Sequence, residues 1–258
     1  MPLLHLSQVL LDLDAAWIFA PVAVLILFPF VIELAPALAR PGRGRASLGL
    51  LAVAVAAWLP AALAPAYSAE RKQRLSFEYL WDAPARKARV MAYHDGGPVP
   101  EAFGEPGQVA RNVDVPWSGY RRWSADARGP ALTPPALERL GERRVGGNRL
   151  VTFRMRSGGS DVIRLVGGKS VRFLAARSGA TGRNFGTEGE AVLRCHGRSC
   201  DGAVFELLIG GTTPVDVTLI GSRSGLPHEV QALARSRPPT AQPQYVPDTS
   251  LAVDRIKL

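Results

Sequence analysis

Residues 17–38 read WIFAPVAVLILFPFVIELAPAL, and residues 46–67 read ASLGLLAVAVAAWLPAALAPAY. Each run holds 22 residues, which as a helix would extend about 33 Å and match the hydrocarbon core of a bilayer. The runs therefore predict a transmembrane helical hairpin over residues 16–67. A secretory signal peptide is the alternative, but such peptides begin with basic residues, and this chain begins MPLLHL. Residues 1–15 are expected to form an interfacial helix or to be a remnant of a longer protein's loop.

The orientation of this hairpin is predicted from the arginines between its two runs. Arg40, Arg43 and Arg45 lie in the short connection, and loops rich in Lys and Arg stay on the cytoplasmic side. The basic stretch at 71–74 argues weakly against this topology. The abundance of Ala, Arg, Gly and Pro is typical of a GC-rich bacterial genome. We therefore expect a bacterial inner-membrane protein whose residues 68–258 form an exported, periplasmic domain.

The formal charge of +9 and the pI near 10.2 raise the question of a nucleic-acid partner. The basic residues are scattered, and no basic stripe interleaved with aromatic residues follows one element. Nucleic acid is therefore not an expected partner, and a basic face beside anionic lipid headgroups explains the charge. Pro29 and Pro36 would weaken the first predicted helix unless neighbouring helices support it. The expected partners are thus the lipid bilayer, other transmembrane helices or a peptidase domain, and further copies of this chain.

The predicted exported domain is rich in short strands. Residues 74–82 alternate Leu75, Phe77, Tyr79 and Trp81 with polar residues, and the next strand, ending at Asp95, is expected to be its hairpin partner. Further strands bounded by Gly or Ser are predicted at 151–155, 161–166, 171–176, 191–195, 203–210, 214–221 and 251–258. The sequence thus predicts a mainly β domain, similar to an antiparallel β-sandwich.

Two short helices and one long loop complete this prediction. Thr133 followed by two prolines predicts a helix start, and apolar residues at helical spacing predict a second helix over 225–237. Residues 96–129 are dense in Gly and Pro and are predicted to be irregular. Within that loop, Trp117, Tyr120 and Trp123 either bind a ligand or anchor the loop to the sheet or to a membrane interface.

The chain has two cysteines, Cys195 and Cys200, in the stretch CHGRSCDG. In an oxidising compartment, cysteines this close across a predicted hairpin would form a disulfide, and two free thiols are the alternative. Zinc binding is not expected here, because these cysteines and His196 are too few ligands and no second pair is present.

No pattern in the chain matches a catalytic apparatus. The four histidines, His5, His94, His196 and His228, are isolated from one another and belong to no metal motif. The GSRSG stretch at 221–225 has its serines misplaced for a nucleophile elbow, and GGKS at 167–170 is expected to be a hairpin turn. The sequence assigns no catalytic residue, no metal ligand and no cofactor, and it does not decide whether the chain is part of an enzyme.

Several stretches resemble a known family when they are taken in their order along the chain. They are RLSFEYLWD, CHGRSCDG, TLIGSRSGLP, RPPTAQPQYVPD and VDRIKL, preceded by the two apolar runs. Together they resemble the C-terminal part of membrane-bound bacterial zinc aminopeptidases of metallopeptidase family twenty-eight, related to the endoplasmic-reticulum metallopeptidase Fxna. In that family an N-terminal domain binds two zinc ions through His, Asp and Glu ligands. Nothing here matches those ligands, so the resemblance implies zinc only in a catalytic domain that this sequence lacks.

Two functions follow as hypotheses. The first is a non-catalytic membrane-anchoring and β-domain region of a zinc aminopeptidase-type protein, in which it would orient the active site and guide peptides. The second is a stand-alone, membrane-tethered periplasmic binding or interaction module, whose Trp117–Trp123 loop would hold a glycan, a lipid or a protein.

Overall fold

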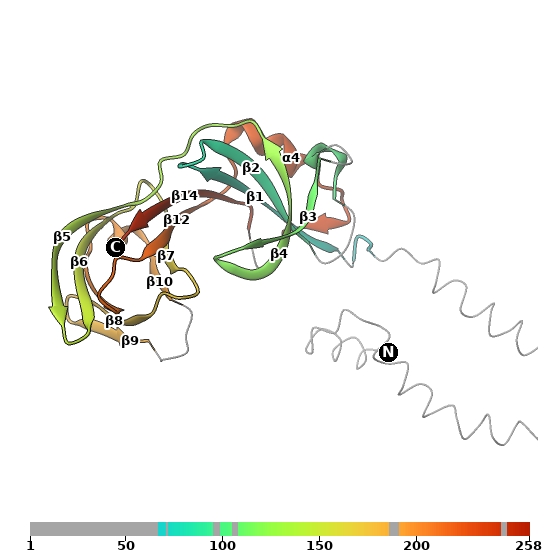
Figure 1. Cartoon of the computed structure of the whole chain (residues 1–258). Helices are drawn as coiled ribbons and strands as arrows, with labels where there is room; N and C mark the ends of the chain where they lie inside the picture. The colour runs from blue at the N-terminus through green and yellow to red at the C-terminus, as the bar shows by residue number, and fades with distance from the viewer. Residues whose placement is uncertain (1–66, 71, 95–98, 105–107, 186–190, 244–246) are drawn as a thin grey trace, which may run out of the picture. The chain divides into compact units, whose positions relative to one another are not determined.

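Strands that alternate in side-chain direction make up most of the described chain (Figure 1). The computed structural model describes residues 67–70, 72–94, 99–104, 108–185, 191–243 and 247–258. These residues belong to one compact unit that begins at residue 66. They form two β-sheets and one short α-helix, α4 (Gln231–Arg235), together with three 3-10 turns, η2 (Glu101–Phe103), η3 (Arg198–Cys200) and η4 (His228–Val230).

The larger sheet has nine strands. Eight of them run in the order β10 (Val192–His196), β7 (Val162–Gly167), β12 (Asp216–Ser224), β14 (Thr249–Lys257), β1 (Gln73–Asp82), β2 (Lys87–His94), β4 (Ser118–Ala127) and β3 (Ala110–Val115), while β13 (Ala241–Gln242) pairs with β1. The predicted hairpin of β1 and β2 is confirmed. Because β1 is parallel to both β14 and β13, the sheet is mixed, whereas the sequence predicted an antiparallel one.

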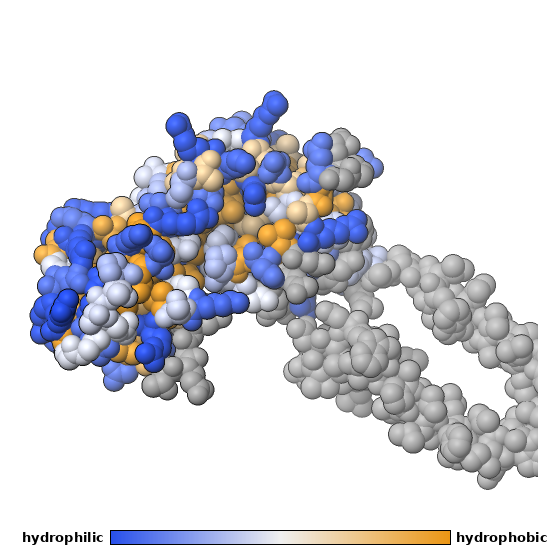
Figure 2. All heavy atoms as spheres, viewed as in Figure 1, coloured by the Kyte–Doolittle hydropathy of each residue, from blue (hydrophilic) through white to orange (hydrophobic). Residues whose placement is uncertain are grey.

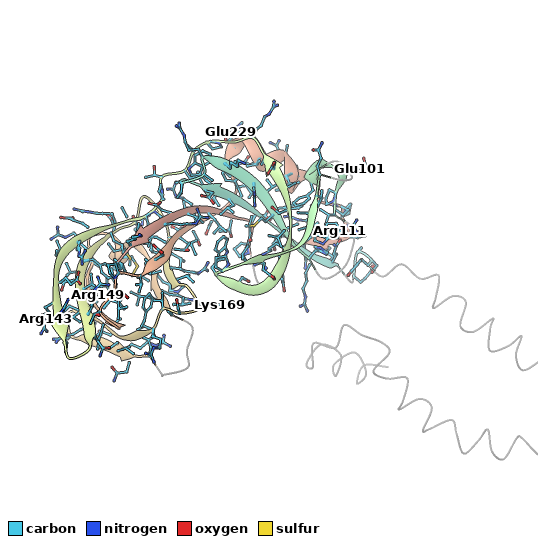
Figure 3. All side chains as sticks on the ribbon, in the orientation of Figure 1. Glu101, Arg111, Arg143, Arg149, Lys169 and Glu229 are labelled. Atoms are coloured by element: carbon cyan, nitrogen blue, oxygen red, sulfur yellow. A yellow bond between two sulfur atoms is a disulfide. The ribbon has the colours of Figure 1, made fainter. Side chains whose placement is uncertain are left out.

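The smaller sheet has five antiparallel strands, in the order β5 (Ala136–Val145), β6 (Asn148–Arg156), β11 (Val204–Gly210), β8 (Phe173–Ser178) and β9 (Thr181–Asn184). Alternate residues of β6 and β11 pack against alternate residues of β7 and β12 and form one apolar core, which includes Phe153, Leu207, Ile163 and Leu219. The two sheets therefore form a sandwich at this end of the unit. Arg149 of β6 (Figure 3) donates hydrogen bonds of 2.9 Å to the Leu258 carbonyl and 3.0 Å to the Thr213 carbonyl, which fixes the C-terminus.

A second core lies where β1 and β2 extend beyond the smaller sheet. There Phe77 and Tyr79 of β1 pack with Leu233 of α4 and with Phe103 of η2. Arg237, just after α4, donates to both Asp248 carboxylate oxygens at 2.6 and 2.8 Å, and its Nε donates to the Leu75 carbonyl at 3.0 Å. These contacts fasten the helical segment to β1.

The third core lies on the opposite face of the larger sheet, which we call the distal face because it points away from the smaller sheet. Leu80, Met91, Ile220 and Val253 are buried there and pack with Val115 at the end of β3. Trp117 and Val192, from opposite ends of the sheet order, pack against this same cluster. The sheet therefore curls, and the tip of the β3–β4 hairpin reaches toward the β7–β10 end of the sheet (Figure 1). Both faces of β1, β12 and β14 are buried as a result.

The predicted fold class, a transmembrane hairpin joined to a β-domain, is wrong: the described chain is mainly β. In the parts of the chain that the structure describes, no helix has the length and apolarity needed to cross a bilayer. The two predicted spans, the interfacial segment and the topology arginines Arg40, Arg43 and Arg45 fall on residues that lie outside that description. The predicted inner-membrane location depended on these two apolar runs spanning a bilayer, and the structure does not support it.

Two local predictions are corrected as well. The segment after Thr133 forms strand β5 instead of a helix, because its backbone pairs with β6 along nearly its whole length and Leu137 packs on the sandwich core. Such tertiary pairing overrides helix propensity. The region 96–129, predicted to be irregular, contains β3 and β4. Pro100 and Pro116 lie outside those strands, which agrees with the scarcity of proline among residues paired in a sheet. The predicted second helix is present as the shorter η4 and α4.

Candidate functional site

A pocket of about 190 Å³ lies on the distal face beside the β3–β4 turn. Leu80, Met91 and Val253 supply buried apolar lining from three neighbouring strands, and the segment from Val113 to Trp117 lines another side. The polar residues that line the pocket are Asp82, Arg89, Asp114, Ser124, Thr218 and Arg255. An apolar lining with a few charged groups is typical of a small ligand site.

The turn that borders this pocket is built by its own sequence. Val115 pairs with Ser118 across the β3–β4 hairpin, so Pro116 and Trp117 occupy the two positions between the strands. Proline has a fixed φ that suits a turn. Val115 is buried in the distal core, and it holds the turn against the sheet.

Trp117 is half-buried, and its indole nitrogen is wholly buried. Among the described residues, Nε1 has no hydrogen-bond partner. A buried donor without an acceptor costs about 1–3 kcal/mol. Trp117 thus combines a side chain that lines the pocket with a buried donor that has no partner among the described residues, and a shift of the ring would be needed for a ligand in the pocket to accept from it.

An ion pair fixes the charge at the opposite side of the pocket. Arg255 donates to both oxygens of the Asp82 carboxylate, at 3.1 and 2.9 Å, from β14 to β1. The hydrogen bond from Arg255 is the main reason why the pKa of Asp82 lies below its usual value, and a backbone hydrogen bond from Ala85 adds to the effect. Asp82 is therefore ionised at neutral pH.

A buried ion pair lies on the same face of the larger sheet as the pocket. The guanidinium of Arg122 on β4 donates to Glu78 on β1, with Nε 3.0 Å from Oε2, and the side chains are only 5% and 7% exposed. Arg122 also lies 5.0 Å from the centre of the Tyr93 ring and donates to Ser118 Oγ at 3.3 Å. These contacts tie β4 and the start of its turn to the sheet. Glu78 and Arg122 therefore have a structural role, because each neutralises the charge of the other.

The three aromatic residues singled out in the sequence do not lie together. Trp117 packs on the distal core, whereas Trp123 packs on the second core, on the other face of the sheet. Trp123 contacts His94 edge to face at 4.5 Å, and Arg111 lies 4.7 Å from its ring centre. Tyr120 is in β4, but its side chain lies outside the description. The geometry thus gives Trp123 an anchoring position and Trp117 a position beside a pocket.

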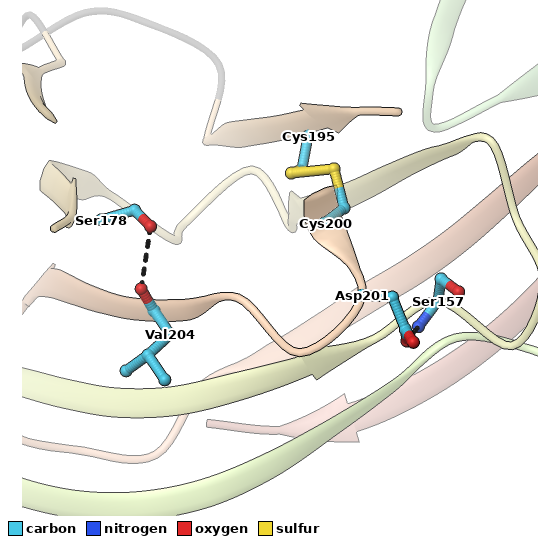
Figure 4. Close-up of a disulfide and its surroundings, with 6 residues drawn as sticks. All are labelled: Ser157, Ser178, Cys195, Cys200, Asp201 and Val204. Atoms are coloured by element: carbon cyan, nitrogen blue, oxygen red, sulfur yellow. Dashed lines mark hydrogen bonds between the residues drawn. A yellow bond between two sulfur atoms is a disulfide. The ribbon is translucent and has the colours of Figure 1, made fainter. Parts of the chain in front are cut away.

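Cys195 and Cys200 are joined by a disulfide (Figure 4), and their Cα atoms are 5.8 Å apart. The bond closes the turn between β10 and η3. Next to it, the Asp201 carboxylate accepts a hydrogen bond from the Ser157 backbone N–H at 2.8 Å, which holds the pKa of Asp201 below its usual value. A disulfide persists in oxidising compartments and so favours an exported location.

Two further hollows lie at the smaller sheet. The larger, about 490 Å³, is a groove lined by Leu150 and Leu208 and bordered by Arg143, Arg177 and Arg183. The other, about 170 Å³, opens between β9 and β10. Figure 2 shows hydrophilic side chains gathered over this end of the unit. Neither hollow has an unpartnered buried donor among its lining residues, so the pocket beside Trp117 is the stronger candidate.

Little in the sequence indicated this pocket. Trp117 could be singled out as an aromatic residue in a Gly- and Pro-rich segment. On the facing side of the pocket, Leu80 and Asp82 of β1 lie more than 170 positions along the chain from Val253 and Arg255 of β14. The two pairs meet only because β14 runs parallel to β1. No spacing rule connects two such segments.

No group of three or more His, Cys, Asp or Glu side chains that could hold a metal ion is present among the described residues. A scan against protein-family models finds no model that matches the chain, and a search of curated proteins finds no match either.

Proposed function

We propose that the described unit is a non-catalytic β-domain of a zinc aminopeptidase-type protein, and that it binds peptides in the pocket beside the β3–β4 turn. The observation that carries the binding proposal is the Trp117 indole N–H, a buried donor on a residue that lines the pocket, for which the described part of the chain supplies no acceptor. A peptide carbonyl is such an acceptor. The apolar lining of Leu80, Met91 and Val253 suits the side chain next to that carbonyl.

The aminopeptidase part of the proposal rests on the order of the motifs along the chain. One of them, RLSFEYLWD, makes up most of β1, and another, VDRIKL, supplies the end of the neighbouring strand β14 from Val253 onward. Both contribute residues to the pocket lining. Peptides are the substrates of the family that these motifs resemble. The ligand class implied by the resemblance therefore agrees with the one favoured by the chemistry of the pocket. Peptide hydrolysis and its zinc ions would belong to a peptidase domain, on this chain's relatives or on a partner.

Calorimetric titration of the full chain with the tripeptide Leu-Gly-Gly tests the binding. We expect a Kd below about 1 mM, equivalent to roughly −4 kcal/mol. Trp117→Phe removes the indole donor and keeps an apolar ring, so it should weaken binding by about 2- to 10-fold. The matched control is Trp123→Phe, on the opposite face, which should leave the Kd unchanged. Equal effects of the two substitutions, or no binding to the wild-type chain, would refute the proposal.

The DNA next to the codon for Met1 tests the aminopeptidase assignment separately. An adjacent reading frame that encodes a His, an Asp, paired Glu residues and a last His supports it. An unrelated neighbouring gene, combined with peptide binding, would instead favour a stand-alone binding module.

A further inference from the structure

Two arginines face each other on the distal face at the edge of the larger sheet. Arg164 of β7 is directly opposite Arg194 of β10 in the antiparallel register. Like charges in directly opposed positions destabilise a strand pair. Among the described residues, neither guanidinium has a hydrogen bond or an ion pair. The pair therefore lacks a counter-charge where one is needed.

Arg164 is half-buried, and its Nε is a buried donor without a partner among the described residues. A second orphaned donor lies on the neighbouring strand β12. Ser222 is only 6% exposed, and its Oγ likewise has no partner in the part of the chain that the structure describes. Arg164 is opposite Ile220 of β12, and Ser222 follows two positions later, so both side chains project from the same face. Diagonal neighbours of this kind have Cα atoms about 7–8 Å apart, which an arginine side chain spans.

The charges around these donors are unbalanced. Arg122, Arg164 and Arg194 contribute three positive charges, whereas Glu78 contributes one negative charge, which Arg122 already neutralises. Burial is the main reason why the pKa of Arg164 is lowered, and the charge of Arg194 lowers it further, while Glu78 raises it only as the last contribution. A bound anion would offset this excess of positive charge.

We infer that Arg164, Arg194 and Ser222 form a binding site for a small oxyanion, a carboxylate or a phosphate. The guanidinium of Arg164 would bind two of its oxygens, since a planar fork of N–H donors matches both anions. The Ser222 hydroxyl would donate to the anion from within the sheet, and Arg194, which is exposed, would close the site from the solvent side. This site is independent of the peptide pocket, because none of its three residues lines that pocket.

Thermal unfolding of the full chain tests this site, with inorganic phosphate and acetate each compared with chloride at equal ionic strength. At about ten times the Kd, the bound anion should raise Tm by roughly 3 °C. Arg164→Met keeps an apolar stem and removes the charge, so it should abolish the rise. It should also raise Tm in chloride, because it ends the repulsion from Arg194. A merely structural arginine would show the opposite, a lower Tm in chloride.

Arg172→Met, which removes an exposed arginine outside the site, is the matched control and should keep the full anion effect. Arg194→Met changes an exposed side chain, so it should fold normally and weaken binding by about tenfold, the value of one charge-assisted contact. Phosphate titration followed by ³¹P NMR line broadening gives the Kd directly. A rise with phosphate alone or with acetate alone supports the site and identifies the anion. Tm values that match those in chloride, or an unchanged anion effect in Arg164→Met, would overturn the inference.

Discussion

The buried ion pair of Glu78 and Arg122 is the residue-scale feature on which the distal face depends most. Both side chains are more than nine-tenths buried, and they join β1 to β4 beneath the turn that carries Trp117. A buried ion pair offsets the cost of desolvation only while both partners are present. Removing one of them leaves an uncompensated charge inside the sheet.

Arg122→Leu should therefore lower the free energy of unfolding by about 3–5 kcal/mol. The double variant Glu78→Gln with Arg122→Leu has no unpaired charge and should recover much of that loss. Urea unfolding of the full chain, in a double-mutant cycle that includes Glu78→Gln alone, measures both effects. Additive losses, with no recovery in the double variant, would mean that the pair contributes no coupling.

Asp82 gives the unit a pH dependence with a defined sign. Because the hydrogen bond from Arg255 lowers its pKa in the folded state below the usual 3.8, its contribution to stability is complete above that value. The contribution is lost as pH falls through the lower, folded-state pKa. In Asp82→Asn this contribution is absent at all pH values. The wild-type chain should thus exceed the variant in free energy of unfolding at about pH 6, and the difference should shrink below about pH 4. A difference that grew on acidification would contradict this.

At the scale of elements, the strands followed from the sequence where their period-two pattern was clear. β1, β6, β11 and β14 lie close to their predicted ranges, because each carries apolar residues at alternate positions that pack in a core. β5 was not recognised, since the stretch ALERLGERRV is mostly exposed and alternates weakly. Its strand conformation is imposed by β6. β3 and β4 were not predicted, because the prolines near them suggested an irregular segment. Those prolines lie in the connections and not in the strands.

The disulfide is an element-scale device, because it joins the end of β10 to the turn before β11. Replacing both cysteines, Cys195→Ala with Cys200→Ala, should lower the free energy of unfolding by about 2 kcal/mol, as expected for a short closed loop. Chemical denaturation of the full chain measures the loss, with reduced wild-type chain as the comparison. Peptide binding beside Trp117 should not change, since the disulfide lies outside that pocket. Loss of peptide binding in a variant that still folds would show that the disulfide influences the pocket, and it would contradict this prediction.

At the scale of the whole molecule, the sequence predicted a mainly β unit but not its pairing. The parallel ladder between residues 78–82 and 249–253 joins segments from opposite ends of the described chain, and local periodicity carries no information about such a pairing. The curl of the larger sheet was hidden for the same reason. Leu80, Met91 and Ile220 occupy the face that alternation alone would assign to solvent, yet the β3–β4 turn covers it. Consequently Trp117 could be suspected from the sequence, while its pocket could not.

The central claim is that peptides bind beside Trp117 on the distal face. The most direct test is NMR of the full chain with ¹⁵N-labelled tryptophan, in which the indole N–H signals of Trp117 and Trp123 are assigned by Trp→Phe variants and followed during addition of Leu-Gly-Gly. We predict that the Trp117 signal moves as its N–H gains an acceptor, whereas the Trp123 signal, on the opposite face, stays in place. A Trp117 signal that does not move at saturating peptide, or that moves only together with that of Trp123, would contradict the account.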